Sequence, residues 1–149
     1  MDKEMHVNRY DPKLTKFMEE ALVKKGFNSL KSSQDVEKYF KENKDFLLFV
    51  NSVCGCAAGS ARPGVLRAIE KNGDLKKMKM ATVFAGVDLE ATEKARSYFS
   101  NHEKSSPNII LFKNKKPVLF MERKDIVHKD AGEIAEILID EISKFKSLV

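Results

Sequence analysis

Apolar positions recur along the chain with two different spacings, which separate the predicted helices from the predicted strands. Helical spacing begins at Asp11-Pro12, an N-cap followed by a first-turn proline, and it stops at Gly26. A second helix is predicted after Ser32 or Ser33, with Val36, Tyr39 and Phe40 on its apolar face. The continuous apolar run over 46–50 then has the length of a strand that is buried on both faces.

A regular succession of elements follows this strand. We predict a helix over 57–71, a strand over 81–87, a helix over 91–99, strands over 108–112 and 118–121, and a last helix opened by Asp130 and Glu133. This is the order of elements in the minimal thioredoxin fold, in which the first βαβ unit is parallel and the hairpin antiparallel. The sequence therefore predicts an α/β protein with a central four-stranded mixed sheet, an optional fifth edge strand over 27–30 and two extra N-terminal helices. Without a linker, an internal repeat or a low-complexity segment, residues 1–149 are expected to form a single thioredoxin-like domain.

Composition narrows the classes of function. The chain of 149 residues is 33% charged with a net charge of +5, but Lys and Arg are spread along its length and form no basic stripe. Nucleic acid is therefore not an expected partner. The first residues lack an apolar signal segment and no apolar run has membrane-spanning length, so we expect a cytoplasmic protein without membrane contact. A monomer is the default expectation for its oligomeric state.

The cysteines Cys54 and Cys56 are the strongest candidates for chemistry. They stand between a buried strand and a helix, too close together to staple distant parts of a fold, and structural disulfides are rare in the cytosol. The unpaired N–H groups and positive dipole end of a helix favour a thiolate over a thiol. Cys54 precedes the helix and is the expected nucleophile, whereas Cys56 lies in the first turn, where the chain is expected to cover it.

The one-residue gap between the cysteines points away from a general reductant. Residues two apart on a helix diverge by roughly 200°, so a Cys54–Cys56 disulfide cannot form inside regular helix and its closed ring is expected to be strained. Strained disulfides are labile. The pair is suited to accept a thiol adduct on Cys54 and pass it to another small thiol, with the internal disulfide as an alternative route.

Two prolines bear on the same region. Ser106-Pro107 precedes a strand at the position where thioredoxin-fold proteins carry a cis-proline, which would expose the Ser106 backbone to an extended substrate; the alternative is a trans proline at the start of a strand. Pro63 lies inside the predicted helix, where it would clash with the carbonyl of Gly59 and produce a kink. The alternative there is a helix that begins near Arg62.

Several segments resemble the bacilliredoxin family from about Leu14 to Ile142. They are Asn51-Ser52-Val53-Cys54-Gly55-Cys56-Ala57-Ala58-Gly59 with Ala61-Arg62-Pro63, then Thr82-Val83-Phe84-Ala85-Gly86 with Asp88 and Glu90-Ala91-Thr92, Ser105-Ser106-Pro107, and Glu122-Arg123. The resemblance implies a thioredoxin-like fold and removal of bacillithiol from protein mixed disulfides. It implies that Cys54 takes up bacillithiol, that free bacillithiol or Cys56 clears the adduct, and that Gly55, Ser106 and Pro107 contact the substrate. Bacillithiol is then a co-substrate, proteins carrying it are the partners, and no resident cofactor is expected.

Other functions stay open. The cysteine pair could instead serve a protein disulfide isomerase or reductase, or a non-catalytic module that binds thiols or metal. Metal is the weaker interpretation because His6, His102 and His128 stand in separate polar segments, where each is expected to be solvated, so no metal ligands are assigned.

Overall fold

The computed structural model describes residues 12–147, so Asp11, the expected cap of the first helix, lies outside the described residues. The elements follow one another as α2 (Pro12–Val23), β1 (Phe27–Ser29), α3 (Ser33–Glu42), β2 (Phe46–Asn51), the π-helical turn η1 (Ala57–Ala61), α4 (Arg62–Lys71), α5 (Gly73–Lys77), β3 (Lys79–Phe84), α6 (Leu89–Arg96), the 3-10 turn η2 (Ser97–Phe99), β4 (Asn108–Lys113), β5 (Lys116–Met121), α7 (Arg123–Ile126) and α8 (Ala131–Ser147).

The strands form one five-stranded mixed sheet in the order β1-β3-β2-β4-β5, so the four predicted strands are confirmed and the optional fifth strand, β1, is present at the edge. β1 and β2 both pair with β3 in parallel, while β4 runs antiparallel to β2 and to β5. All six residues of β2 are buried, as its continuous apolar run predicts. The carboxyl ends of β1, β2 and β3 therefore meet at one edge of the sheet.

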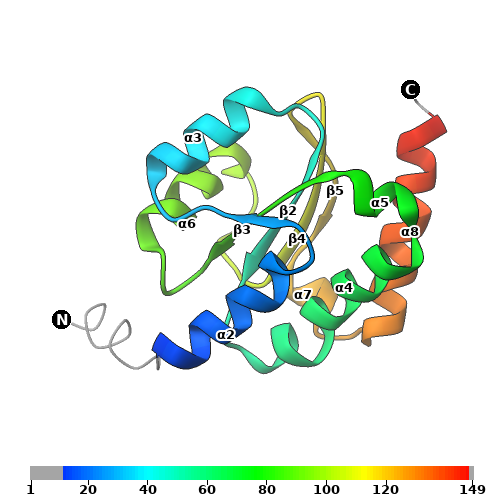
Figure 1. The fold of residues 1–149 in the computed structure, drawn as a ribbon, viewed down its shortest axis with the longest axis horizontal. Coiled ribbons are helices and arrows are strands. Elements are labelled where there is room, and N and C mark those ends of the chain that lie inside the picture. Colours follow the sequence, from blue (N-terminus) through cyan, green and yellow to red (C-terminus); the bar gives the residue numbers. More distant parts are fainter. Residues whose placement is uncertain (1–11, 148–149) are drawn as a thin grey trace.

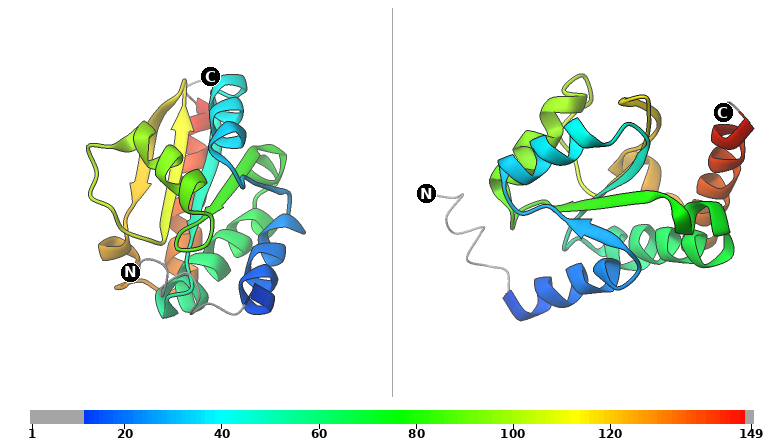
Figure 2. Two further views of the ribbon diagram at one scale, coloured as in Figure 1. Left: turned by 90° about the vertical axis from the view of Figure 1, so that its left-hand side faces the viewer. Right: turned by 45° about the horizontal axis from the view of Figure 1, so that its top comes forward.

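Helices cover both faces of the sheet, and each face has its own core (Figures 1 and 2). On one face α2, α4, α5, α7 and α8 pack against side chains that include Leu47, Phe49 and Leu111. On the other face α3 and α6 pack against side chains that include Phe46, Leu48 and Phe112. Alternating residues of one strand thus enter opposite cores, which holds β2 at the centre of the molecule.

The structure departs from the predicted elements around β3 and at two short helices. The predicted strand over 81–87 lies at Lys79–Phe84, because the backbone turns after Phe84 and reaches a positive φ of 86° at Gly86. The helix α5 was not predicted. Asn72 ends α4 with its backbone N–H bonded to the Ala68 carbonyl, and its side chain caps α5 by accepting from the N–H groups of Asp74 and Leu75. The four-residue helix α7 was also missed. Glu122 and Asp125 form a reciprocal capping box at its N-terminus.

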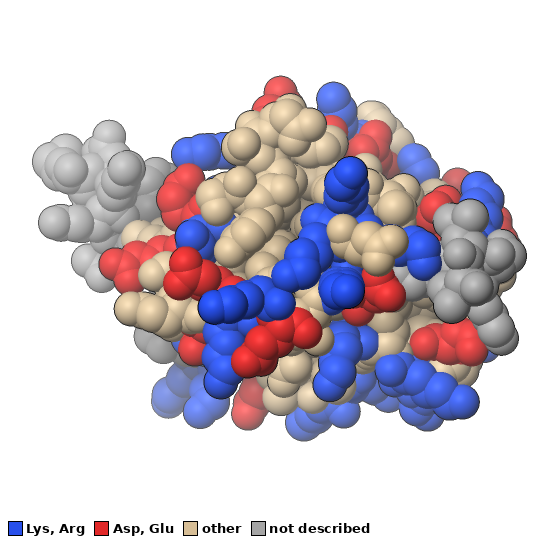
Figure 3. Space-filling view, turned by 90° about the horizontal axis from the view of Figure 1, so that it is seen from above, with Lys and Arg blue, Asp and Glu red and all other residues tan. Residues whose placement is uncertain are grey.

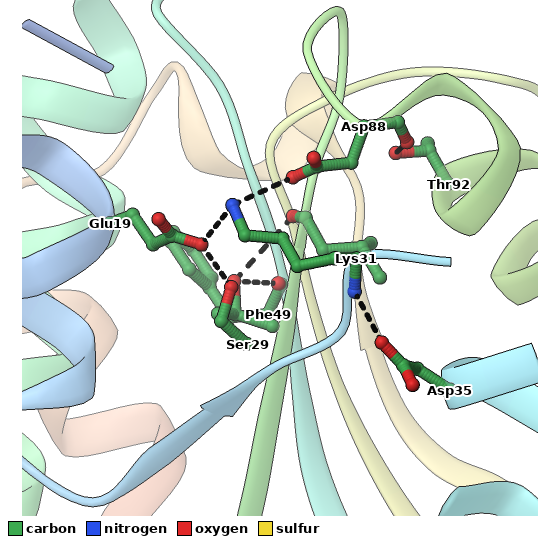
Figure 4. Close-up of polar contacts among 9 residues, drawn as sticks. Glu19, Ser29, Lys31, Asp35, Phe49, Asp88 and Thr92 are labelled. Atoms are coloured by element: carbon green, nitrogen blue, oxygen red, sulfur yellow. Dashed lines mark hydrogen bonds and ion pairs between the residues drawn. The ribbon is translucent and has the colours of Figure 1, made fainter. Parts of the chain in front are cut away.

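The helix α2 is attached to the sheet through the ammonium of Lys31 (Figure 4). This ammonium lies between Glu19 of α2 and Asp88, the residue before α6, at 3.5 Å from an oxygen of Asp88. The hydroxyl of Ser29 also donates to Glu19. The side chains of Glu19 and Asp88 are both only 14% exposed, so two largely buried carboxylates share a single cation.

Replacing Lys31 by methionine is expected to lower the free energy of unfolding by about 1–2 kcal/mol, because both carboxylates lose their cation. The loss stays below that of a fully buried pair because the Lys31 side chain is half exposed. Urea denaturation measures it. Lys25→Met is the control, since the exposed Lys25–Glu70 pair at 3.2 Å should contribute less than about 0.5 kcal/mol. Equal stability of the two variants would contradict the prediction.

The surface carries charges of both signs. On the face shown in Figure 3, Lys and Arg side chains stand among Asp and Glu side chains, next to an area without charged groups. None of the helices within residues 12–147 combines the length and the apolar character needed to cross a membrane.

Candidate active site

The two cysteines lie where the chain leaves β2 and enters a helix. The carbonyl of Cys54 accepts hydrogen bonds from the N–H groups of Ala57 at 3.1 Å and Ala58 at 3.3 Å, so Cys54 stands at the start of the helix and outside it. Its own N–H donates to Ser52 Oγ at 3.2 Å. Gly55 is exposed, and a Cβ added there would meet nothing within 4 Å. The approach to the cysteines is therefore open at Gly55.

The two thiols are free and in direct contact, with their Sγ atoms 2.6 Å apart. Burial has the largest single effect and raises the pKa of Cys54, while a hydrogen bond from the Cys56 thiol lowers it. Backbone N–H groups at the helix start and the charge of Arg123 act in the same direction, so the pKa of Cys54 lies below its ordinary value. The pKa of Cys56 is raised, by burial first and then by the neighbouring Cys54. The geometry thus favours one thiolate, on Cys54.

Cys56 is less covered than its place in the first turn suggests. It packs against the core between the sheet and α4, but it keeps an intermediate exposure like that of Cys54. The expectation that the chain covers Cys56 is therefore wrong, because both sulfurs emerge on the same side of the helix start. Cys56 is within reach of any group that is bound to Cys54.

Pro63 does not kink a continuous α-helix. The chain passes through the π-helical turn η1 and begins α4 at Arg62, so Pro63 occupies the first turn of α4, where the fixed φ of proline suits the helix. The alternative of a helix beginning near Arg62 is thus correct for α4, but residues 57–61 form a helical turn and no loop. The change of helix type accommodates the proline.

Ser106 and Pro107 lie at the same edge of the sheet. The Ser106–Pro107 peptide bond is cis. Pro107 comes directly before β4, and the register pairs Asn108 with Val50 of β2. Arg96 holds this loop by donating to the carbonyl of Ser105 at 3.0 Å. The loop before β4 is therefore anchored next to the end of β2, from which the cysteines follow.

A buried arginine lies under the cysteine turn. The side chain of Arg62 is 8% exposed, and its Nη1 donates to Asn51 Oδ1 at 2.8 Å and to the carbonyl of Ser52 at 2.9 Å. Asn51 Oδ1 also accepts from the N–H of Ser52 at 2.9 Å. These bonds join α4 to the last residue of β2 and fix the backbone that leads to Cys54.

Sequence reasoning assigned no role to Arg62, Asn51 or Arg123. One signal was available for Arg62: it stands between Ala61 and Val65 on the apolar side of its helix, where a charged residue needs a buried partner. No comparable signal marks Arg123, which is exposed and acts on the cysteines only because α7 brings it near them.

Metal ligands do not gather in this part of the chain. Within residues 12–147, no three His, Cys, Asp or Glu side chains are placed to share a metal ion. His102 is not simply solvated as expected, because its ring stacks on Phe120 at a centroid distance of 3.7 Å and its Nδ1 lies 3.8 Å from Glu122. His128 is exposed as expected, and His6 lies outside the described residues.

Comparison with known proteins agrees with this geometry. The model of a family described as "Disulphide isomerase" matches residues 10–146. A bacilliredoxin of Geobacillus kaustophilus is 39% identical over 137 residues, covering 91% of this chain and 94% of the relative. A bacilliredoxin of Bacillus licheniformis is 42% identical over 132 residues, covering 85% and 88%. The chain belongs to the bacilliredoxin family.

Solved structures confirm the thioredoxin fold. A protein described as a putative oxidoreductase with a thioredoxin fold superposes with a TM-score of 0.54 at 18% identity, covering 74% of this chain and 92% of that chain. The thioredoxin of Fasciola hepatica superposes with a TM-score of 0.50 at 18% identity, covering 77% and 98%. By its family, the protein is a thiol–disulfide oxidoreductase.

Proposed function

We propose that this bacilliredoxin removes bacillithiol from protein mixed disulfides, with Cys54 as the nucleophile and bacillithiol as the co-substrate. The observation that carries the proposal is the asymmetry of the two touching thiols at the helix start. The pKa of Cys54 is lowered and that of Cys56 raised, so one sulfur is prepared to attack while its neighbour stays protonated. Relatives at about 40% identity bear the name bacilliredoxin.

The exchange takes place in two steps. The Cys54 thiolate attacks the bacillithiol sulfur of the mixed disulfide, a Cys54–bacillithiol disulfide forms, and the client cysteine leaves as a thiolate that takes up a proton. A second bacillithiol thiolate then attacks the bacillithiol sulfur of this adduct, giving bacillithiol disulfide and restoring the Cys54 thiolate. Alternatively Cys56, as a thiolate, attacks Cys54, releases bacillithiol and closes a Cys54–Cys56 disulfide that an external dithiol must reduce.

Gly55, Ser106 and Pro107 are the proposed contacts of the client segment. Gly55 leaves the approach to the sulfurs free, and the loop of Ser106 and Pro107 presents backbone beside the end of β2. An extended client segment can pair with such backbone groups as a further strand does.

Replacing Cys56 by serine is expected to leave the first step within about threefold of the wild-type rate, because Cys54 remains the better nucleophile. The adduct on Cys54 should then persist until free bacillithiol is added. The measurement is mass spectrometry of both proteins after mixing the variant with a bacillithiol-modified client. Loss of client release in Cys56→Ser would show that both thiols take part in every turnover and would contradict this mechanism.

Disulfide isomerase or reductase activity of the Cys54–Cys56 pair is the second candidate. It is favoured by the family description and by the direct contact of the two sulfurs. It requires both thiols, so it predicts that Cys56→Ser fails on a client with scrambled disulfides. Testing Cys56→Ser on the bacillithiol-modified client and on the client with scrambled disulfides separates the two candidates. If the variant still removes bacillithiol but does not reshuffle disulfides, the bacilliredoxin reaction is supported.

A further inference from the structure

The positive charge of Arg62 is buried and is surrounded by neutral hydrogen-bond partners. More than nine-tenths of its surface is buried, and a guanidinium stays protonated under all ordinary conditions. Its hydrogen bonds go to neutral oxygens, those of the Asn51 amide and the Ser52 carbonyl. Among residues 12–147, no Asp or Glu side chain forms an ion pair with it, although the exposed surface carries many such pairs.

A buried charge without a counter-ion is costly, so proteins bury cations next to anions. The anion available to Arg62 is the Cys54 thiolate. Arg62 Nη1 binds the carbonyl of Ser52, and the hydroxyl of the same Ser52 accepts from the N–H of Cys54. One residue thus links the guanidinium to the backbone of the nucleophile. Asn51 turns its oxygen to Arg62, although its Nδ2 is buried without a partner within residues 12–147.

We propose that Arg62 is the buried counter-ion of the Cys54 thiolate and sets how readily Cys54 attacks and leaves. The proposal rests on the proposed role of Cys54 as nucleophile. Burial lowers the pKa of Arg62, and the charge of Cys54 opposes that shift. Arg62 acts through Cys54 and is therefore a positioning residue.

The pairing has a consequence for each step of the exchange. While bacillithiol is bound to Cys54 as a disulfide, the thiolate is gone and the charge of Arg62 has no anionic partner. Breaking the adduct at the Cys54 sulfur restores the pair, so Arg62 favours Cys54 as the leaving group. The positive charge that promotes ionisation of Cys54 therefore also speeds the release of bacillithiol from Cys54. Both effects favour transfer of bacillithiol to a second thiol.

Three other ionisable groups bear on the titration of Cys54 or lie beside it: the Cys56 thiol on the same segment, Arg62 on α4 and Arg123 on α7. Arg123 is exposed, so salt should screen its effect, whereas the effect of buried Arg62 should be nearly unchanged by salt. Measuring the Cys54 pKa at about 0.05 M and about 1 M salt therefore separates the two arginines.

The test uses the thiolate absorbance and the iodoacetamide rate of the full chain as functions of pH. Arg62→Gln keeps a donor for the Ser52 carbonyl but removes the charge, and we expect the pKa of Cys54 to rise by at least about one unit, a tenfold loss of thiolate at lower pH. Arg62→Lys keeps the charge and should lose less than half of that shift. Arg67→Met, an equal loss of charge at an exposed site of the same helix, should change nothing.

The proposal would be overturned if the pKa of Cys54 in folded Arg62→Gln equalled that of the wild-type protein. It would also be overturned if Arg62→Gln and Arg62→Lys shifted the pKa of Cys54 equally. If Arg62→Gln does not fold, the NMR resonances of the Arg62 guanidinium nitrogens in the wild-type protein test the proposal instead. They should follow the titration of Cys54 and lose that transition in Cys54→Ser, and their failure to do so would equally overturn it. None of these readouts uses bacillithiol, so failure here is distinct from failure of the proposed transfer reaction.

Discussion

Cys54→Ser is expected to abolish transfer of bacillithiol from a modified client, with a loss of at least about a thousandfold. A serine hydroxyl cannot form the mixed disulfide on which both steps depend, and its oxygen stays protonated at the helix start. The measurement is the rate of client release at pH 7.5, followed by mass spectrometry. Cys56→Ser is the matched control, since it removes the second thiol and leaves the first step in place.

The pH dependence of alkylation checks the same assignment without a client. Because the pKa of Cys54 is lowered, the iodoacetamide rate of the wild-type protein should rise at a lower pH than that of an ordinary cysteine and reach a plateau once Cys54 is ionised. In Cys54→Ser only Cys56 remains, and its rate should rise at a more alkaline pH. Undiminished transfer in Cys54→Ser, or a fast low-pH phase that survives in it, would assign the reaction to Cys56.

Gly64→Ala is expected to destabilise the fold by about 2–3 kcal/mol, although alanine favours helix over glycine. Gly64 lies where α4 crosses α8, and an added Cβ would come within 2.7 Å of the Cβ and Cγ2 atoms of Ile134 and within 3.1 Å of the Ala131 carbonyl. These atoms belong to a helix backbone and to a branched side chain beside it, so they cannot yield without moving α8. Thermal denaturation should show a melting temperature lower by about 10 °C.

Gly59→Ala is the matched control, because Gly59 stands five residues earlier in the same helical segment and its Cβ would meet nothing within 4 Å. This variant should melt near the wild-type temperature. A stabilised Gly64→Ala would mean that helix propensity outweighs the contact with Ile134, and that α8 can shift at little cost.

Much of this architecture could be predicted from local pattern. The run over 46–50 is buried on both faces because it is apolar at every position, and the sheet places it at the centre. The helices α3 and α6 were found because their apolar residues repeat at helical spacing. The cysteine turn could be placed because a strand ends and a helix begins within a few residues of it.

The features that sequence reasoning missed are either too short to show a periodic pattern or depend on contacts between distant residues. The short helices α5 and α7 contain too few residues to show a periodic pattern, and each forms because a side chain caps it. The stacking of His102 on Phe120 joins a loop to β5, and no local pattern in either segment predicts it. The place of Lys31 between Glu19 and Asp88 requires the packing of α2 beside the sheet.

The sequence by itself determined the fold class, the position of the cysteine pair at a helix start and the family to which the chain belongs. These follow from periodicity, from spacing and from motifs that are read along the chain. The tertiary structure alone decided which charges act on the cysteines. Arg62 binds the segment that leads to Cys54 because η1 and α4 turn it toward Asn51 at the end of β2. Arg123 acts on both thiols because β5 carries α7 back to that edge. Electrostatic interaction depends on distance through space and on burial, and neither can be read from the order of residues.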